Sequence, residues 1–313
     1  MELHAPTAGT ASSPPLRRRR WRWILLALAG VVVLGAAVGC SMLSEFQPAI
    51  DTPEMRSSGL TSGFVETASG RIHVVRSGLA PGASRVLFVH GSPGTWSAWE
   101  GWMENAALRS AARLLAPDRI GFGGSERGTA EPSLARQAAS LAAVLEAEPG
   151  PPAVVVGHSL GGPIAVRLAM DRPDLVAALL LVAPSIDPAL EKHRWYNVAG
   201  ATLAVQLFLP VDWTTSNREL WPLKRELEAM MPLWRGIDCP TVVVQGEADD
   251  LVPAANADLA ERQLAHLGDR LEIRRYPGMG HFILWQRPET VTEPLLELLG
   301  AGHSGDAGEG GAP

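Results

Sequence analysis

The stretch that decides the fold is Ala153-Val154-Val155-Val156-Gly157-His158-Ser159-Leu160-Gly161. An apolar run of strand-forming residues ends at a glycine, a serine follows, and the residues from 160 to 171 resemble a helix. A strand, a tight turn and a helix in this order are the setting of a nucleophile elbow, a strained turn that presents a serine hydroxyl. Side chains at Gly157 and Gly161 would collide with neighbouring backbone in such a turn. Ser159 is therefore the candidate nucleophile.

Further apolar runs lie on both sides of this stretch, at residues 85–89, 112–115, 178–182, 241–244 and 271–276. Helix-like stretches lie between most of them, at residues 133–148, 160–171 and 254–267. Runs without polar alternation, separated by helices, predict a parallel sheet that is covered on both faces. Upstream, residues 63–75 predict a β-hairpin that turns at Ser69-Gly70. The expected fold class is therefore α/β, with a mostly parallel central sheet and helices on both faces.

Two more motifs follow strand-like runs: His90-Gly91-Ser92-Pro93-Gly94, and the Asp-x-x-Gly-x-Gly-x-Ser pattern at residues 118–125. With the elbow, and in this order, they resemble the α/β-hydrolase family over roughly residues 63–299. The resemblance implies that the backbone N–H groups of Ser92 and Leu160 form an oxyanion hole. It also implies that residues 118–125 are mainly structural. His90 resembles a catalytic histidine, but we expect it instead to hold its loop by hydrogen bonds.

The remaining triad members must follow the serine, as an acid and then a histidine. Residues 245–253, which end in Asp-Asp-Leu-Val-Pro, resemble the family's acid loop and make Asp249 the acid. Asp250 is its neighbour, and Asp187 is a competitor because some family members place the acid after the earlier strand. His281, in Pro-Gly-Met-Gly-His-Phe after residues 271–276, matches the family's histidine loop.

The resemblance implies acyl transfer. Ser159 attacks a carbonyl carbon, His281 takes the serine proton, and Asp249 orients the imidazole and stabilises it when it is charged. An acyl-enzyme forms and water hydrolyses it. No metal ion and no organic cofactor is implied, because the sequence holds no cluster of metal ligands.

Residues 184–233 separate two predicted strands and are too many for a simple loop, so we expect them to form a helical lid. The lid is rich in aromatic and aliphatic residues, which favours a substrate with a hydrophobic acyl or alcohol group. Trp96, Trp99 and Trp102, close to the Ser92 loop, point the same way, although Trp102 also fits the core.

A fold does not fix a function, and several chemistries use this triad. The serine at the elbow argues against epoxide hydrolases and haloalkane dehalogenases, whose members carry aspartate there. Carboxylesterase or lipase activity on a small hydrophobic ester is the first expectation. The alternatives are a carbon–carbon bond hydrolase, an amidase, a cofactor-free haloperoxidase, and a tethered binding protein with an inactive site.

The N-terminal part predicts a membrane attachment. We expect residues 1–22, which end in a block of arginines, to be disordered, and residues 23–40 to form a hydrophobic signal or anchor segment. Arginines before the apolar run and none soon after it place the N-terminus in the cytoplasm and the later residues outside it.

The apolar run ends at Ala37-Val38-Gly39-Cys40, which resembles the lipobox of bacterial lipoproteins and makes Cys40 a lipidation candidate. An uncleaved signal anchor is the equal alternative. Residues 41–60 are expected to be a linker, residues 61–300 the hydrolase domain, and residues 301–313 a flexible tail.

The composition is that of a globular protein with 46% hydrophobic and 19% charged residues. Its net charge is −6, although the arginine block is strongly basic. The rest of the chain is therefore acidic, which argues against nucleic-acid binding, because phosphate contacts need a basic face.

Overall fold

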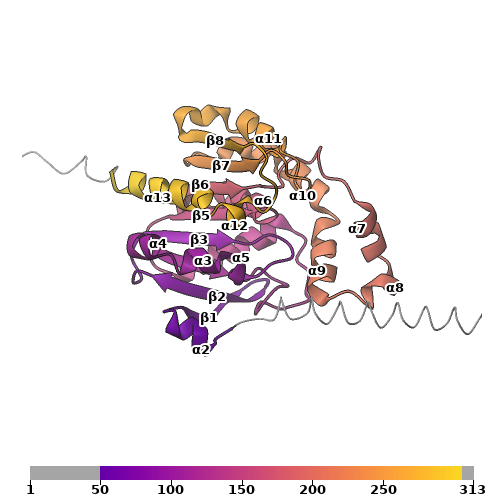
Figure 1. Ribbon diagram of the computed structural model, residues 1–313, viewed down its shortest axis with the longest axis horizontal. Helices are drawn as coiled ribbons and strands as arrows, with labels where there is room; N and C mark the ends of the chain where they lie inside the picture. Colours follow the sequence, from indigo (N-terminus) through magenta and orange to yellow (C-terminus); the bar gives the residue numbers. More distant parts are fainter. Residues whose placement is uncertain (1–49, 305–313) are drawn as a thin grey trace, which may run out of the picture. The chain divides into compact units, whose positions relative to one another are not determined.

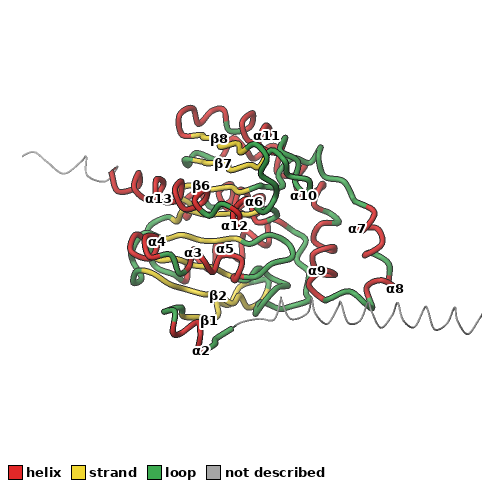
Figure 2. Tube along the Cα trace, viewed as in Figure 1, coloured by secondary structure: helices red, strands yellow, loops and turns green. Residues whose placement is uncertain are grey.

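The computed structural model describes residues 50–304, with side chains to residue 300. Within this part of the chain, eight strands form one sheet in the order β1-β2-β4-β3-β5-β6-β7-β8 (Figures 1 and 2). The strands are β1 (Thr61–Thr67), β2 (Gly70–Gly78), β3 (Arg85–Val89), β4 (Arg113–Pro117), β5 (Ala153–His158), β6 (Val176–Val182), β7 (Thr241–Gly246) and β8 (Leu271–Tyr276). The first two form the predicted hairpin, β2 runs antiparallel to β4, and all pairs from β4 to β8 are parallel. The predicted mostly parallel sheet is confirmed.

Helices cover both faces of the sheet (Figure 1). One face packs against α5 (Leu134–Ala147), α6 (Gly161–Asp171) and α11 (Asn256–Gln263), and the other against α3 (Glu100–Met103), α4 (Ala106–Ala111) and α13 (Glu289–Ser304). Successive strand residues point to opposite faces. In β3, Leu87 and Val89 accordingly join one apolar cluster, and Val86 and Phe88 join the other. Burial on both faces explains why the strand sequences are continuously apolar.

The tryptophans near the Ser92 loop belong to the core. Trp96, Trp99 and Trp102 are 2%, 0% and 4% exposed, and the Trp99 ring stacks on Phe88 at 5.0 Å between centroids. They lie in and after the short 3-10 helix η1 (Trp96–Trp99), which packs on the sheet. The expectation that they indicate a hydrophobic substrate is wrong. Proximity to a functional loop does not distinguish a ring in the core from one that lines a site.

The segment expected to be a lid is helical and lies between β6 and β7. Its helices are α7 (Trp195–Gly200), α8 (Leu203–Gln206), α9 (Val211–Leu220), α10 (Leu223–Met230) and the 3-10 helix η3 (Met231–Gly236). Leu223, Leu227 and Met230 of α10 are buried in the core, whereas α7 and α8 stand beyond one end of the strands (Figure 1). We call residues 184–233 the cap.

Short elements complete the described chain: α2 (Pro53–Ser57), η2 (Pro173–Leu175), η4 (Ala265–Arg270) and α12 (Ile283–Gln286). The helix α2 falls inside the expected linker 41–60, and its Met55 is 4% exposed in a core cluster. The packed domain therefore begins before residue 60. A helix of five residues with one buried side chain leaves too little periodicity in the sequence to predict it.

None of the described helices combines the length and the apolar character that a bilayer crossing requires. The expectation of a flexible tail at residues 301–313 does not hold for residues 301–304, which belong to α13. The predictions for residues 1–22, for the apolar segment 23–40 with Cys40, for residues 41–49 of the linker and for residues 305–313 concern residues outside the described part of the chain.

Candidate active site

Ser159 occupies the tight turn between β5 and α6, at the carboxyl end of the sheet. Its φ angle is +54°, in the left-handed region that non-glycine residues rarely adopt. A Cβ on Gly157 would lie 2.5 Å from the carbonyl oxygen of Gly161, and a Cβ on Gly161 would lie 2.2 Å from that of Val89. The two glycines are therefore required by close backbone approach, as the sequence predicts.

The side chains of Ser159, His281 and Asp249 form one hydrogen-bonded chain. His281 Nε2 lies 3.1 Å from Ser159 Oγ, and His281 Nδ1 lies 2.8 Å from Asp249 Oδ2. The other carboxylate oxygen, Oδ1, accepts hydrogen bonds from the backbone N–H groups of Leu251 at 2.9 Å and Val252 at 2.7 Å. Both carboxylate oxygens are thus held, and one of them faces the imidazole. The three side chains come from the loops after β5, β7 and β8, which meet at one edge of the sheet.

The two competing acids lie elsewhere. Asp250 is exposed. Asp187 follows β6, and its carboxylate accepts a hydrogen bond from Ala189 N–H at 2.8 Å and lies 3.9 Å from Arg262. The acid that contacts His281 is Asp249.

His158, the residue before the serine, supports the histidine loop. Its Nε2 lies 3.3 Å from the carbonyl oxygen of His281, and the two rings are 4.9 Å apart. Burial, followed by the neighbouring His281, lowers the pKa of His158 to about 3. His158 therefore stays neutral and donates to this carbonyl rather than exchanging protons near neutral pH.

Ser92 and Leu160, the residues expected to form the oxyanion hole, flank the serine. Leu160 directly precedes the first residue of α6, where the helix dipole favours negative charge. Gly91 lies against Ser159, because a Cβ on Gly91 would be 3.0 Å from Ser159 Cβ. In the described part of the chain, the Ser92 and Leu160 N–H groups have no hydrogen-bond acceptor. One of these N–H groups belongs to the residue that follows Ser159, and the other to the residue that follows Gly91.

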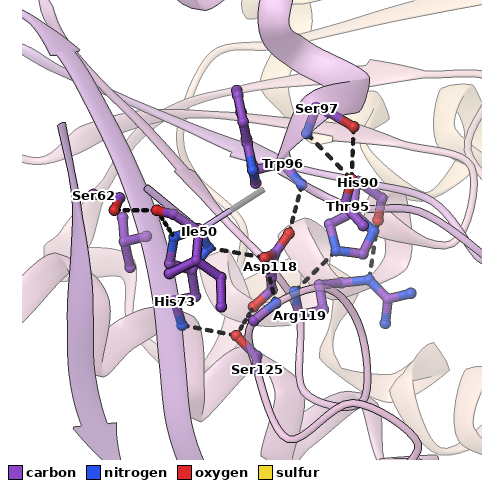
Figure 3. A network of polar contacts seen from close by, with 12 residues as sticks. Ile50, Ser62, His73, His90, Thr95, Trp96, Ser97, Asp118, Arg119 and Ser125 are labelled. Carbon is purple, nitrogen blue, oxygen red and sulfur yellow. Dashed lines mark hydrogen bonds and ion pairs between the residues drawn. The ribbon is translucent and has the colours of Figure 1, made fainter. Parts of the chain in front are cut away.

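His90 holds the loop that carries Ser92, as expected. Its Nε2 accepts a hydrogen bond from Arg119 N–H at 2.9 Å (Figure 3). Nδ1 therefore carries the proton, which it donates to Gly91 O at 2.8 Å. Burial, and then the charge of Arg119, holds the pKa of His90 well below its ordinary value. His90 is a neutral, fixed support for the loop.

A second His–Asp pair, between His73 and Asp118, is structural (Figure 3). The two side chains are 2.9 Å apart and almost completely buried. The Asp118 carboxylate also accepts hydrogen bonds from the N–H groups of Trp96 at 2.7 Å and Gly124 at 2.8 Å. Ser125, the nearby serine, donates its hydroxyl proton to the Asp118 carbonyl and is fully buried. The expected structural role of residues 118–125 agrees with these contacts.

The sequence does not single out Arg119, Gln137 or Glu219, which form a buried polar group under the Ser92 loop. Glu219 lies on α9 of the cap, and its carboxylate contacts Ser92, Arg119 and Gln137. One signal in the sequence is the position of Arg119 directly after Asp118. The cap residue Glu219 carries no motif of its own.

The comparisons with known proteins agree with this architecture. A model of the Alpha/beta hydrolase family matches residues 86–293. Lipase LipV of Mycobacterium tuberculosis is 34% identical over 179 residues, which are 57% of this chain and 61% of the lipase. The chain thus spans about three fifths of the length of that relative.

Two solved structures share the fold. A membrane phospholipase A has a TM-score of 0.61 and 19% identity over 91% of this chain and 98% of that protein. The epoxide hydrolase CorEH has a TM-score of 0.60 and 16% identity, and covers 77% of this chain and 99% of its own. At these identities the likeness concerns the fold alone. The family match extends across the elbow, acid and histidine loops, and the chain belongs to the α/β hydrolase family.

Proposed function

We propose that the protein is a membrane-anchored serine hydrolase that cleaves carboxylic esters with a hydrophobic acyl or alcohol group. The observation that carries the proposal is the continuous hydrogen-bonded chain from Ser159 Oγ through His281 to Asp249. A serine hydroxyl is a weak nucleophile until an oriented base removes its proton, and this chain supplies an oriented base.

In the proposed reaction, Ser159 Oγ bonds to the ester carbonyl carbon while its proton passes to His281 Nε2. The carbonyl electron pair moves to oxygen, and the N–H groups of Ser92 and Leu160 stabilise the resulting oxyanion. Collapse of this intermediate breaks the bond to the alcohol oxygen, which takes the proton from His281. Water then attacks the acyl-enzyme by the same route, which releases the carboxylic acid and restores Ser159.

Three features favour ester hydrolysis within this family. The elbow carries serine, not the aspartate that the resemblance associates with epoxide and haloalkane substrates. Two backbone donors flank the nucleophile, which suits a reaction that makes a carbonyl oxygen anionic. The third feature is the likeness to a lipase over 57% of the chain, which favours the same class of reaction.

The cap favours hydrophobic substrates. No charged residue occurs in positions 195–211. Trp195, Leu203 and Leu207 in this segment are 80%, 75% and 74% exposed. Several large exposed apolar side chains in one uncharged segment are typical of a site for an apolar ligand, a membrane or another protein. We propose that the cap is a mobile lid that buries the apolar part of the ester and excludes water.

Turnover of a series of nitrophenyl esters tests the substrate proposal. Each buried methylene contributes about 0.8 kcal/mol, so kcat/KM rises about fourfold per added carbon until the apolar site is full. Replacement of residues 195–208 by a short Gly-Ser linker flattens this gradient while acetate turnover persists. A preference for acetate in both proteins contradicts the hydrophobic-site proposal and leaves the triad proposal intact.

A further inference from the structure

Glu219 is a cap residue whose charged group is buried in the body of the protein. It lies on α9 and is 2% exposed. Its Oε1 accepts hydrogen bonds from Arg119 Nη1 and Gln137 Nε2, both at 3.1 Å. Its Oε2 accepts from Arg119 Nη2 at 3.1 Å and from Ser92 Oγ at 3.0 Å. Each carboxylate oxygen therefore has two donors, and one donor belongs to the loop beside the nucleophile.

Arg119, the ion-pair partner of Glu219, donates hydrogen bonds from its guanidinium group to the backbone of the same loop. Its Nε donates to the carbonyl oxygen of His90 and its Nη2 to that of Gly91, both at 3.0 Å. Figure 3 shows Arg119 beside His90, which also donates to the Gly91 carbonyl from Nδ1. The Gly91 carbonyl is thus fixed by two donors.

The Gly91 carbonyl and the Ser92 N–H belong to one peptide group. A peptide group is planar and trans, so its C=O and N–H point in opposite directions. Fixing the Gly91 carbonyl toward Arg119 therefore also fixes the direction of the Ser92 N–H. The Ser92 hydroxyl, held by Glu219, fixes the same residue from its side chain.

We propose that Glu219 is a positioning residue for the oxyanion hole: from the cap, it holds Arg119 and Ser92 so that the Ser92 N–H is aimed at the developing oxyanion. This inference rests on the proposed function. The proposal makes catalysis dependent on the contacts of Glu219 itself, because loss of these contacts removes the counter-charge of buried Arg119 and releases the Ser92 side chain. Through these contacts, a residue of the cap completes the oxyanion hole.

The chain offers a matched control on the same helix. Asp212 of α9 is 1% exposed and forms a two-point ion pair with Arg127, with contacts of 3.1 and 2.6 Å. This pair also joins α9 to the body, but Asp212 has no described contact with the Ser92 loop. Glu219→Gln and Asp212→Asn therefore each replace a buried, ion-paired carboxylate of α9 by an amide. Only Glu219 contacts the loop of the proposed oxyanion hole.

The test measures kcat and KM on one nitrophenyl ester, and the inhibition constant of a trifluoromethyl ketone that forms a tetrahedral adduct with Ser159. A misplacement of about 1 Å costs up to about a hundredfold in rate. We expect Glu219→Gln to lower kcat about ten- to a hundredfold with little change in KM, and to weaken ketone binding by a similar factor. Asp212→Asn should keep kcat within about twofold.

Ser92→Ala keeps the backbone donor, breaks one contact of Glu219, and serves where Glu219→Gln does not fold. Its kcat should fall severalfold at unchanged KM. A wild-type kcat in the folded Glu219→Gln protein overturns the inference. If Glu219→Gln does not fold, a wild-type kcat in Ser92→Ala overturns it instead. A loss of kcat in Asp212→Asn equal to that in Glu219→Gln also overturns it. Absence of ester turnover in the wild-type protein refutes the proposed function and this inference together.

Discussion

At the residue scale, the site depends on how each group is held. Ser159 sits at a positive φ that its flanking glycines permit, and His281 contacts one oxygen of a carboxylate whose other oxygen is bound by two backbone N–H groups. A fixed carboxylate keeps the imidazole in one tautomer, with its proton on Nδ1 and its free nitrogen toward the serine. In the proposed mechanism, the backbone N–H groups that hold the Asp249 carboxylate are therefore as important as the negative charge of that carboxylate.

Asp249→Asn should lower kcat about ten-thousandfold without unfolding the protein, because an amide facing His281 Nδ1 favours the wrong tautomer. Asp187→Asn is the matched control, since its Ala189 contact survives in the amide and its Arg262 is 3.9 Å away. This second variant should keep kcat within about twofold. Steady-state turnover of one ester by both proteins is the measurement, and inactivity confined to Asp187→Asn would place the acid after β6.

The sequence predicts these residues because each one lies in a local motif directly after a strand. Glu219 shows the limit of such reasoning. It is separated from Arg119 by 100 residues, and nothing near it in the sequence indicates which buried cation it meets. The pairing of Glu219 with Arg119 depends on how the cap packs against the rest of the domain, and no local sequence pattern indicates that packing.

At the element scale, an ionic cluster joins the hairpin, the sheet and α5 at the end of the strands away from Ser159. The Glu148 carboxylate, which directly follows α5, contacts Arg76 of β2 at 2.5 Å and Arg113 of β4 at 2.8 Å. Burial by itself raises the pKa of Glu148, but the two guanidinium groups outweigh burial and hold the pKa below its ordinary value. The ionised carboxylate therefore stabilises the folded state.

Because the folded-state pKa of Glu148 is depressed, its contribution is present above the unfolded-state pKa of about 4.3 and is lost as the pH falls through the folded-state pKa. Glu148→Gln should lower the free energy of unfolding at pH 7 by about 2–3 kcal/mol. The difference from wild type should shrink below about pH 4.

Chemical denaturation at several pH values measures this difference. Glu297→Gln is the control. The Glu297 carboxylate is 60% exposed and pairs with Arg274, so loss of this pair should change the free energy of unfolding by less than about 0.5 kcal/mol. A pH-independent difference for Glu148→Gln would show that the effect is not ionic.

Strands were predictable because a buried parallel sheet requires continuous apolar runs, as at residues 153–156 and 241–244. The tryptophans show where this reasoning ends. The sequence places aromatic residues near a loop, but only the packing decides whether their rings face the core or a binding site. The Trp99 ring faces the core.

At the scale of the whole molecule, we propose that the N-terminal segment holds the catalytic domain at a membrane. A tether raises the effective concentration of the site at that surface without a new contact. An exposed, uncharged cap segment suits substrates that are supplied from an apolar phase. In this proposal, the arginines before the apolar run 23–40 would orient the domain away from the cytoplasm.

Cys40→Ala distinguishes the two kinds of anchor. For a lipoprotein, the change blocks lipid attachment and leaves an unprocessed precursor. For a signal anchor, migration and labelling by a lipid precursor stay unchanged. Fractionation and lipid labelling of both proteins are the measurements, and recovery of the full-length wild type away from the membrane fraction would contradict both versions.

Active-site labelling shows whether Ser159 is the residue that forms the acyl-enzyme. The full-length protein is treated with a fluorophosphonate, and the modified peptide is located by mass spectrometry in the wild type and in Ser159→Ala. We predict one adduct, on Ser159, its loss in the variant, and a fall in ester turnover of about a million-fold in a folded protein. An adduct on another serine, or ester turnover near the wild-type rate in folded Ser159→Ala, would exclude Ser159 as the nucleophile.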